Sequence, residues 1–188
     1  LFVKPILFFS FRKEFSMRYV LPVAISTLLG SPAALVHAAD LNVKLELPRL
    51  NVAEYHKPYV AVWIEKGDQS FAGNLTVWYD LKKRNNEGTK WLKDLRQWWR
   101  KSGRDLTMPV DGLSAATRTA GEHSLTFSTD KSVLGQLPAG EYQLLVEAAR
   151  EGGGREVVKV PFTWGGKGEF TAKAQGSHEI GTVAVQIK

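Results

Sequence analysis

Three hydroxyl side chains in a segment of small residues, 110–121, are the groups in this sequence best placed to meet a large partner. Ser114, Thr117 and Thr119 follow an Asp111-Gly112 pair. Asp-Gly starts a tight turn, because aspartate bonds to its own backbone and glycine tolerates positive φ. Small neighbours leave the hydroxyl groups accessible. The segment is therefore a candidate site, and the alternative is an ordinary connecting loop.

The same segment resembles the acceptor motif for covalent FMN attachment, Asp-Gly-x-Ser/Thr-Gly-Ala-Thr/Ser-x-Thr. The matching residues are Asp111, Gly112, Ser114, Ala116, Thr117 and Thr119. The resemblance implies that an FAD:protein FMN transferase, a Mg²⁺-dependent enzyme, esterifies Thr117 through the flavin phosphate. Ala115 departs from the motif, which has glycine there. Glycine permits positive φ and close approach of a partner, and alanine restricts both.

A tryptophan-rich stretch, 90–102, precedes this segment. Its apolar residues recur at helical spacing, which predicts a short amphipathic helix with Gly103 as its C-cap. The apolar set is Trp91, Leu92, Leu95, Trp98 and Trp99. We expect them to dock the helix on the domain, because so short a helix needs tertiary contacts. The alternative is an exposed tryptophan that meets a ligand.

Residues 82–104 are strongly basic, with nine Lys or Arg against Glu87 and Asp94. If FMN is attached at Thr117, its phosphate needs cations and its ring needs an aromatic surface. The cationic candidates are Arg96, Arg100, Arg104 and Arg118, and the stacking candidates are Trp98 and Trp99.

Other chemistry has little support in the sequence. His56, His123 and His178 are isolated, and neither a Gly-x-Ser-x-Gly elbow nor a phosphate-binding loop occurs. The chain has no cysteine, which excludes disulfides and thiolate sites. Half of the net charge of +6 belongs to residues 1–39, which argues against nucleic acid as a partner. We expect no catalytic residues and no metal site.

Alternating and β-branched runs predict strands over most of the chain. They cover 41–47, 59–65, 74–79, 124–128, 142–147, 157–164 and 182–187. Gly-rich residues 151–154 predict a hairpin between two of them. Short strands punctuated by turns indicate an all-β, immunoglobulin-like β-sandwich with one short inserted amphipathic helix.

The first 38 residues read as a leader and not as part of the domain. From Met17 a short basic region, an apolar run and a small-residue site ending at Ala38 form a signal peptide pattern over 17–38. The alternative is a membrane anchor. Residues 1–16 show no pattern of structure, and we expect them to be an upstream extension before a start at Met17. The mature domain is then 39–188.

The mature chain also resembles DUF2271, a family of predicted periplasmic proteins. The resemblance rests on residues 59–65, 91–100, 111–121 and 140–151. The last of these blocks also resembles the immunoglobulin-like domain of flagellar hook-assembly proteins. Such families imply a partnership with membrane reductases of the PepSY type.

Two functions from different classes follow. The first is a periplasmic electron carrier with FMN esterified to Thr117, which needs little catalytic machinery because the cofactor supplies the chemistry. The second is a non-catalytic binding or assembly module of the cell envelope. An independent enzyme is the least favoured.

The leader pattern gives a prediction about export. Signal peptidase should cut after Ala38, because Val36 and Ala38 supply the small residues that the enzyme requires. N-terminal sequencing of protein from the soluble periplasm should begin at Ala39 or Asp40. A membrane-bound species that begins at Met17 would contradict this expectation.

Overall fold

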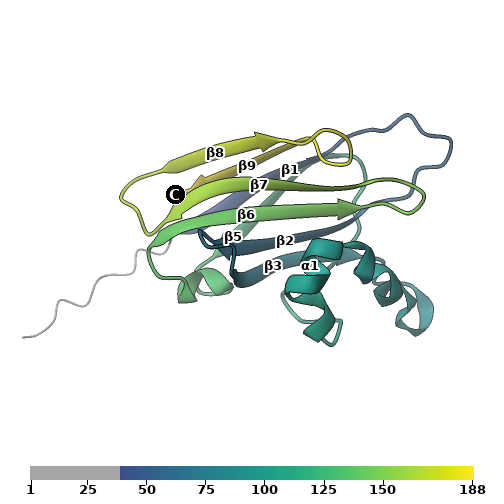
Figure 1. Ribbon diagram of the computed structural model, residues 1–188, viewed down its shortest axis with the longest axis horizontal. Coiled ribbons are helices and arrows are strands. Elements are labelled where there is room, and N and C mark those ends of the chain that lie inside the picture. The colour runs from purple at the N-terminus through teal and green to yellow at the C-terminus, as the bar shows by residue number, and fades with distance from the viewer. Residues whose placement is uncertain (1–38) are drawn as a thin grey trace, which may run out of the picture. The chain divides into compact units, whose positions relative to one another are not determined.

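The computed structural model describes residues 39–188, which form two packed β-sheets and a helical insert (Figure 1). The four-stranded sheet has the order β5-β1-β9-β8, and the five-stranded sheet has the order β4-β3-β2-β6-β7. The strands are β1 (Asp40–Leu47), β2 (Tyr59–Lys66), β3 (Phe71–Tyr79), β4 (Ser114–Ala116), β5 (Gly121–Ser128), β6 (Gly140–Ala149), β7 (Arg155–Trp164), β8 (Phe170–Gln175) and β9 (Thr182–Ile187). The predicted all-β sandwich is confirmed, whereas the predicted leader, 1–38, lies outside the described residues.

The seven predicted strands are present, and the structure adds β4 and β8. Strand β4 has three residues, too few to show a period in the sequence. Strand β8 turns Ala172 and Ala174 toward the core, and such small side chains give a weak hydrophobic signal. The predicted hairpin joins β6 to β7 in antiparallel register.

The main core lies between the two sheets. Leu41, Val43 and Leu45 alternate along β1 with exposed or half-buried residues and are fully buried, as a strand with one wet face requires. Val60, Val62 and Ile64 of β2 meet them from the five-stranded sheet.

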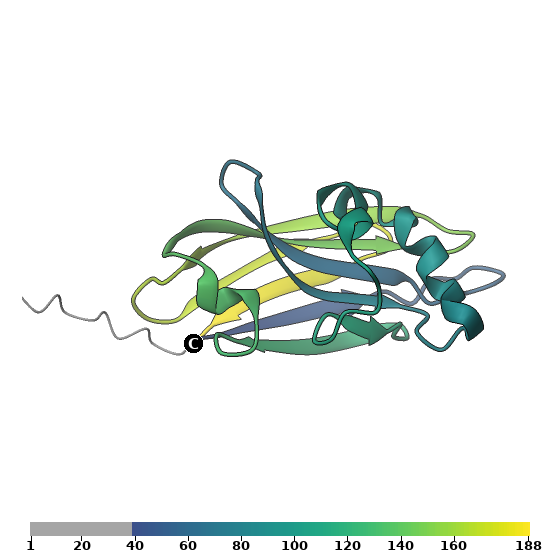
Figure 2. The ribbon, with the colours of Figure 1, turned by 90° about the horizontal axis from the view of Figure 1, so that it is seen from below.

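A second core lies on the outer face of the five-stranded sheet, so its central strands are buried on both sides. On this face Ala61, Trp63, Val77, Tyr79 and Leu145 pack against Leu92, Leu95 and Trp98 of the helical insert. The insert consists of the 3₁₀ helix η1 (Arg84–Asp94), the α-helix α1 (Arg96–Lys101) and the 3₁₀ helix η2 (Gly103–Asp105). It gathers at one end of the strands (Figure 2). A further 3₁₀ helix, η3 (Val133–Gln136), precedes β6.

The prediction of one α-helix over 90–102 is wrong in detail. The chain leaves helical geometry at Leu95, with φ −74° and ψ 70°, between η1 and α1. The 3₁₀ helix η1 has about three residues per turn and not the 3.6 of an α-helix, and this turns Trp91 outward. Trp91 is 45% exposed, although we expected it in the core. Gly103 is not a left-handed cap: a Cβ atom there would lie 2.5 Å from the Trp98 ring, so glycine permits close packing.

A buried carboxylate holds α1 on the sheet. Glu147 of β6 is fully buried and accepts hydrogen bonds from the backbone N–H groups of Gln97, at 3.0 Å, and Trp98, at 2.8 Å. Arg155 of β7 donates to the same carboxylate at 2.8 Å. Leu95 offers no capping side chain, so Glu147 provides the hydrogen bonds that the first turn of α1 lacks.

Two further polar side chains hold the other end of α1. Glu65 of β2 is buried, accepts from the Trp63 indole N–H at 3.0 Å and pairs with Lys101 at 3.4 Å. Asn74 of β3 accepts from the Trp98 indole N–H at 2.8 Å and donates to the Ser102 hydroxyl at 2.7 Å. The insert is therefore fixed at both ends of α1 by side chains of the three central strands.

Removing the Glu147 carboxylate should loosen the insert. We expect Glu147→Ala to cost about 3–5 kcal/mol of unfolding free energy, because it leaves two backbone N–H groups and a guanidinium without their partner. Glu147→Gln keeps an acceptor oxygen and should cost less. Urea denaturation followed by circular dichroism measures both.

The matched control is Glu141→Ala on the same strand. Glu141 is exposed and accepts only from the Thr163 hydroxyl at 3.0 Å, so its loss should stay within about 0.5 kcal/mol. Equal denaturation midpoints for the two alanine variants would show that the Glu147 carboxylate does not hold α1 on the sheet.

Candidate functional site

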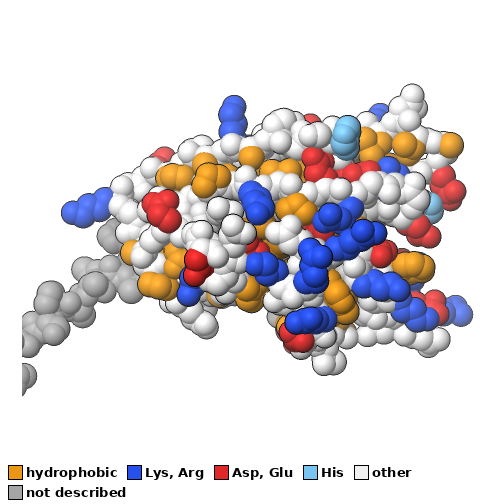
Figure 3. All heavy atoms as spheres, viewed as in Figure 1, with side chains coloured by type: hydrophobic (Ala, Val, Ile, Leu, Met, Phe, Trp, Pro, Cys, Tyr) orange, Lys and Arg blue, Asp and Glu red, His pale blue; other side chains and the backbone are white. Residues whose placement is uncertain are grey.

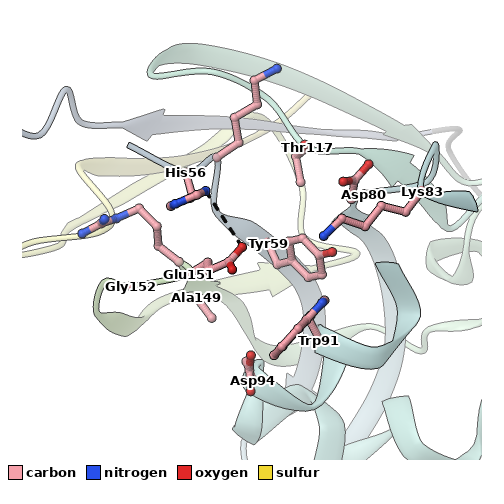
Figure 4. Close-up of a pocket in the computed structure, with 12 residues that line it drawn as sticks. His56, Tyr59, Asp80, Lys83, Trp91, Asp94, Thr117, Ala149, Glu151 and Gly152 are labelled. Atoms are coloured by element: carbon pink, nitrogen blue, oxygen red, sulfur yellow. Dashed lines mark ion pairs between the residues drawn. The ribbon is translucent and has the colours of Figure 1, made fainter. Parts of the chain in front are cut away.

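A pocket of about 640 Å³ lies at one end of the five-stranded sheet (Figure 4). The topology explains its position: β2 begins at the end of the sheet where its antiparallel neighbours β3 and β6 finish. Strand β4 runs parallel to β3 and finishes there too. The lining residues are His56, Lys57, Tyr59, Asp80, Lys83, Trp91, Asp94, Thr117, Ala149, Arg150, Glu151 and Gly152.

Thr117 lies on the wall of this pocket and is partly exposed. Its backbone N–H donates to the Tyr79 carbonyl at 3.2 Å, which extends the parallel pairing of β4 with β3 by one residue. The backbone of Thr117 is thus fixed by the sheet while its side chain faces the pocket. Of the candidate residues in the small-residue segment, this is the one that the structure brings to the pocket.

Two aromatic side chains line the same pocket. Trp91 of η1 lies on the side opposite Thr117, with Tyr59 between them (Figure 4). The Tyr59 hydroxyl donates to the Gly88 carbonyl at 3.1 Å, and its ring meets Tyr79 edge-on at 6.4 Å. Burial raises the pKa of Tyr59, so its phenol is neutral at neutral pH. The two rings offer a flat ligand an apolar surface with a polar margin.

Charges of both signs line the pocket. Lys57, Lys83 and Arg150 contribute positive charge, and Asp80, Asp94 and Glu151 contribute negative charge. Arg150 is committed to Glu179, with two hydrogen bonds of 2.9 and 3.0 Å between largely buried groups. Lys57 and Lys83 are therefore the cations of this pocket most available to a phosphate.

The start of the motif-like segment serves the turn and not the pocket. The Ser114 hydroxyl accepts from the Val110 N–H at 2.9 Å, and Gly112 takes a φ of +73° at the exposed tip beside Asp111. Along an extended strand, three residues separate Ser114 from Thr117 by about 10 Å. Asp111, Gly112 and Ser114 thus shape the loop before the strand that delivers Thr117.

Ala115, which departs from the motif, lies within β4 opposite Trp78. Its φ is not positive, unlike those of Gln69, Asn85 and Asn86 among the non-glycine residues that the structure describes. The backbone conformation at position 115 therefore does not require glycine.

The six side chains expected near a flavin from the sequence do not line this pocket, and two of them, Arg96 and Arg104, are exposed elsewhere on the insert. Trp98 is fully buried, with its indole N–H bonded to Asn74, so a ligand cannot stack on it in the folded protein. Trp99 is half-buried, 6.3 Å from the Trp98 ring. Arg100 is exposed on α1, and the Arg118 guanidinium lies over Trp78 at 4.3 Å.

Sequence reasoning missed Trp91 and Tyr59 as site residues. Trp91 was assigned to the core from helical spacing, and Tyr59 was assigned only to a predicted strand. One signal was available: Tyr59 opens a predicted strand and Asp80 follows another directly, and the ends of neighbouring strands often meet. The turn of Trp91 out of the core depends on η1 being a 3₁₀ helix, which the sequence pattern does not show.

Neither a metal-binding cluster nor a membrane-spanning helix occurs in residues 39–188. In that part of the chain no three His, Asp or Glu side chains come together as a metal-binding group. The helices described there are too short or too polar to cross a bilayer.

The fold and the pocket define an all-β sandwich protein with a ligand-sized site at the ends of its central strands. The chain belongs to the DUF2271 family, described as predicted periplasmic proteins, whose profile matches residues 40–182. The match supports a periplasmic location. Comparisons with curated proteins and with solved structures gave no match.

Trp91 is exposed and Leu95 is buried, so their replacement should affect stability differently. Trp91→Ala should change the unfolding free energy by less than about 1 kcal/mol, whereas Leu95→Ala should cost about 2–5 kcal/mol because it leaves a cavity in the second core. Urea denaturation of both variants compares them directly. A larger loss for Trp91→Ala than for Leu95→Ala would mean that the indole packs inward in solution.

Proposed function

We propose that this protein is a periplasmic electron carrier that holds FMN esterified to Thr117 and exchanges electrons with a membrane reductase of the PepSY type. The observation that carries the proposal is the position of Thr117, on the wall of a pocket that Trp91 and Tyr59 also line. The exported chain would reach the periplasm after cleavage behind Ala38.

The pocket fits the cofactor in size and in chemistry. Small-molecule sites commonly enclose about 300–1,000 Å³, a range that includes this pocket. Lys57 and Lys83 would bind the phosphate, and Trp91 or Tyr59 would provide the surface for the ring. In the roles that sequence reasoning assigned, these residues replace Arg96, Arg100, Arg104, Arg118, Trp98 and Trp99.

Attachment needs an accessible hydroxyl on a fixed backbone. The Thr117 oxygen forms an ester bond to the phosphorus of the FMN half of FAD, the pyrophosphate bond breaks, AMP leaves and the hydroxyl proton is released. A separate FAD:protein FMN transferase with Mg²⁺ performs this step. The hydrogen bond from the Thr117 N–H to Tyr79 keeps the acceptor in place, and the open pocket admits the donor.

When bound, FMN supplies the capacity to accept and donate electrons. The chain supplies attachment through Thr117, orientation through its aromatic walls and phosphate binding through its lysines. The phenol of Tyr59 remains protonated and donates to the Gly88 carbonyl, so it adds no charge beside the ring. In this function the protein is a carrier and not an independent enzyme.

The mixed charge of the pocket favours one second candidate, a binding module of the cell envelope. Acidic and basic side chains around Trp91 and the half-buried Tyr59 also suit a neutral or zwitterionic ligand, such as a peptide or a glycan. Such a module would use Trp91 and Tyr59 without any covalent group on Thr117.

Replacement of Thr117, the proposed acceptor, distinguishes the electron carrier from the binding module. Co-expression with an active transferase in the periplasm should add one FMN per chain, seen by intact mass and by acid-stable fluorescence. Thr117→Ala should abolish the addition while unfolding free energy changes by less than about 0.5 kcal/mol, because the side chain is partly exposed. The matched control, Thr107→Ala, removes an exposed hydroxyl outside the motif-like segment and should still be loaded.

Ala115→Gly, which restores the common motif, should load at least as well as the natural sequence. Flavin on the Thr117→Ala variant, or none on the natural chain beside a transferase that loads another substrate, would reject the carrier. The binding module would then be the better function.

A further inference from the structure

The exposed cations of residues 82–104 form a strongly positive surface, called here the basic face. Its members are Lys82, Lys83, Arg84, Lys90, Lys93, Arg96, Arg100 and Arg104, all exposed. Blue side chains gather over the insert and the neighbouring strand ends in Figure 3. We infer that this face is the docking surface for an acidic protein partner.

Charge is segregated in this domain. Residues 82–104 carry nine basic and two acidic side chains, a net of +7. With residues 1–39 contributing half of the chain's +6, the described domain carries +3, so the rest of it carries −4. A field divided in this way orients an approaching partner of opposite charge and raises its association rate.

The cations of the basic face are largely unpaired. Lys90 pairs with Glu87 at 3.3 Å, and Arg104 pairs with Asp105 at 3.7 Å. Among residues 39–188, the other six members make no ion pair with a carboxylate. Their charge is therefore available to a partner.

The fold gains little from these charges. Arg96 and Arg100 stand four residues apart on α1, where like charges repel and destabilise a helix. The contacts that hold α1 come from Glu147, Glu65 and Asn74, with Lys101 the one basic residue of α1 that joins them. Arg96 and Arg100 thus take no part in holding α1, which leaves their charge for a contact with another molecule.

The apolar side chains favour a protein partner over an anionic membrane surface. A helix that binds a bilayer turns an apolar face outward, but Leu92, Leu95 and Trp98 point into the second core. Of the described residues, Trp91 is the one large hydrophobic side chain exposed within 82–104. One tryptophan among many charges suits the small, polar interface of a transient complex.

Docking on the basic face would bring the partner to the margin of the pocket. Trp91 and Lys83 belong to residues 82–104 and also line the pocket. Electron transfer across this contact depends on the proposed carrier function. The docking of an acidic partner does not depend on it.

The test uses the mature chain and a fluorescent poly-L-glutamate peptide as the acidic probe, with binding followed by anisotropy at low and at physiological salt. Arg96→Glu combined with Arg100→Glu should weaken binding by about tenfold or more, because it reverses charge at the contact. The matched control, Lys167→Glu combined with Lys173→Glu, makes the same change in net charge at exposed positions outside the basic face. It should weaken binding by less than about twofold.

Equal losses for the two double variants would show that only net charge matters and would overturn the proposal. Binding of phosphatidylglycerol vesicles without binding of poly-L-glutamate would overturn it in favour of a membrane surface. If the glutamate variant fails to fold by circular dichroism, Arg96→Gln with Arg100→Gln replaces it, and unchanged binding would then overturn the proposal. Thr117→Ala should bind the probe as the natural chain does, so failure of flavin attachment and failure of docking are separate results.

Discussion

The hydrogen bonds between the Glu147 carboxylate and the first turn of α1 are the interaction on which the functional end of this domain depends. A six-residue helix is too short to be stable alone, and its start has no capping residue of its own. Glu147 provides that cap from the sheet beneath, and Arg155 offsets the charge that would otherwise be buried alone. With α1 held in place, η1 is held over the end of the sheet, and η1 carries Trp91.

The pocket then follows from where strands end. Tyr59 begins β2, Asp80 follows β3 and Ala149 ends β6, so the antiparallel order brings them to the same end of the sheet. The short parallel strand β4 delivers Thr117 to the same place. One wall is therefore rigid sheet and the other is the 3₁₀ helix, so the groups that line the pocket are held in fixed positions.

The insert also divides acidic from basic side chains. Its buried contacts use the carboxylates Glu65 and Glu147, which are satisfied by hydrogen bonds and by the cations Lys101 and Arg155. Its exposed cations take no part in those contacts and are left for solvent or a partner. The backbone and apolar residues of the insert thus hold it on the sheet, and its exposed charges form the basic face.

The sequence by itself determined the sandwich, because alternation in β1 and β-branched runs such as β2 report directly which face of a strand is buried. It also singled out Thr117, since turn chemistry and a motif are local properties. Only the tertiary structure decided that Trp98 is buried and Trp91 exposed, because that depends on the break at Leu95 and on where the sheet offers Glu147 and Asn74 as partners. It likewise decided that Ser114 serves the turn while Thr117 faces a pocket. Residues from β2, η1 and β6 meet there only through long-range packing, which a local pattern does not encode.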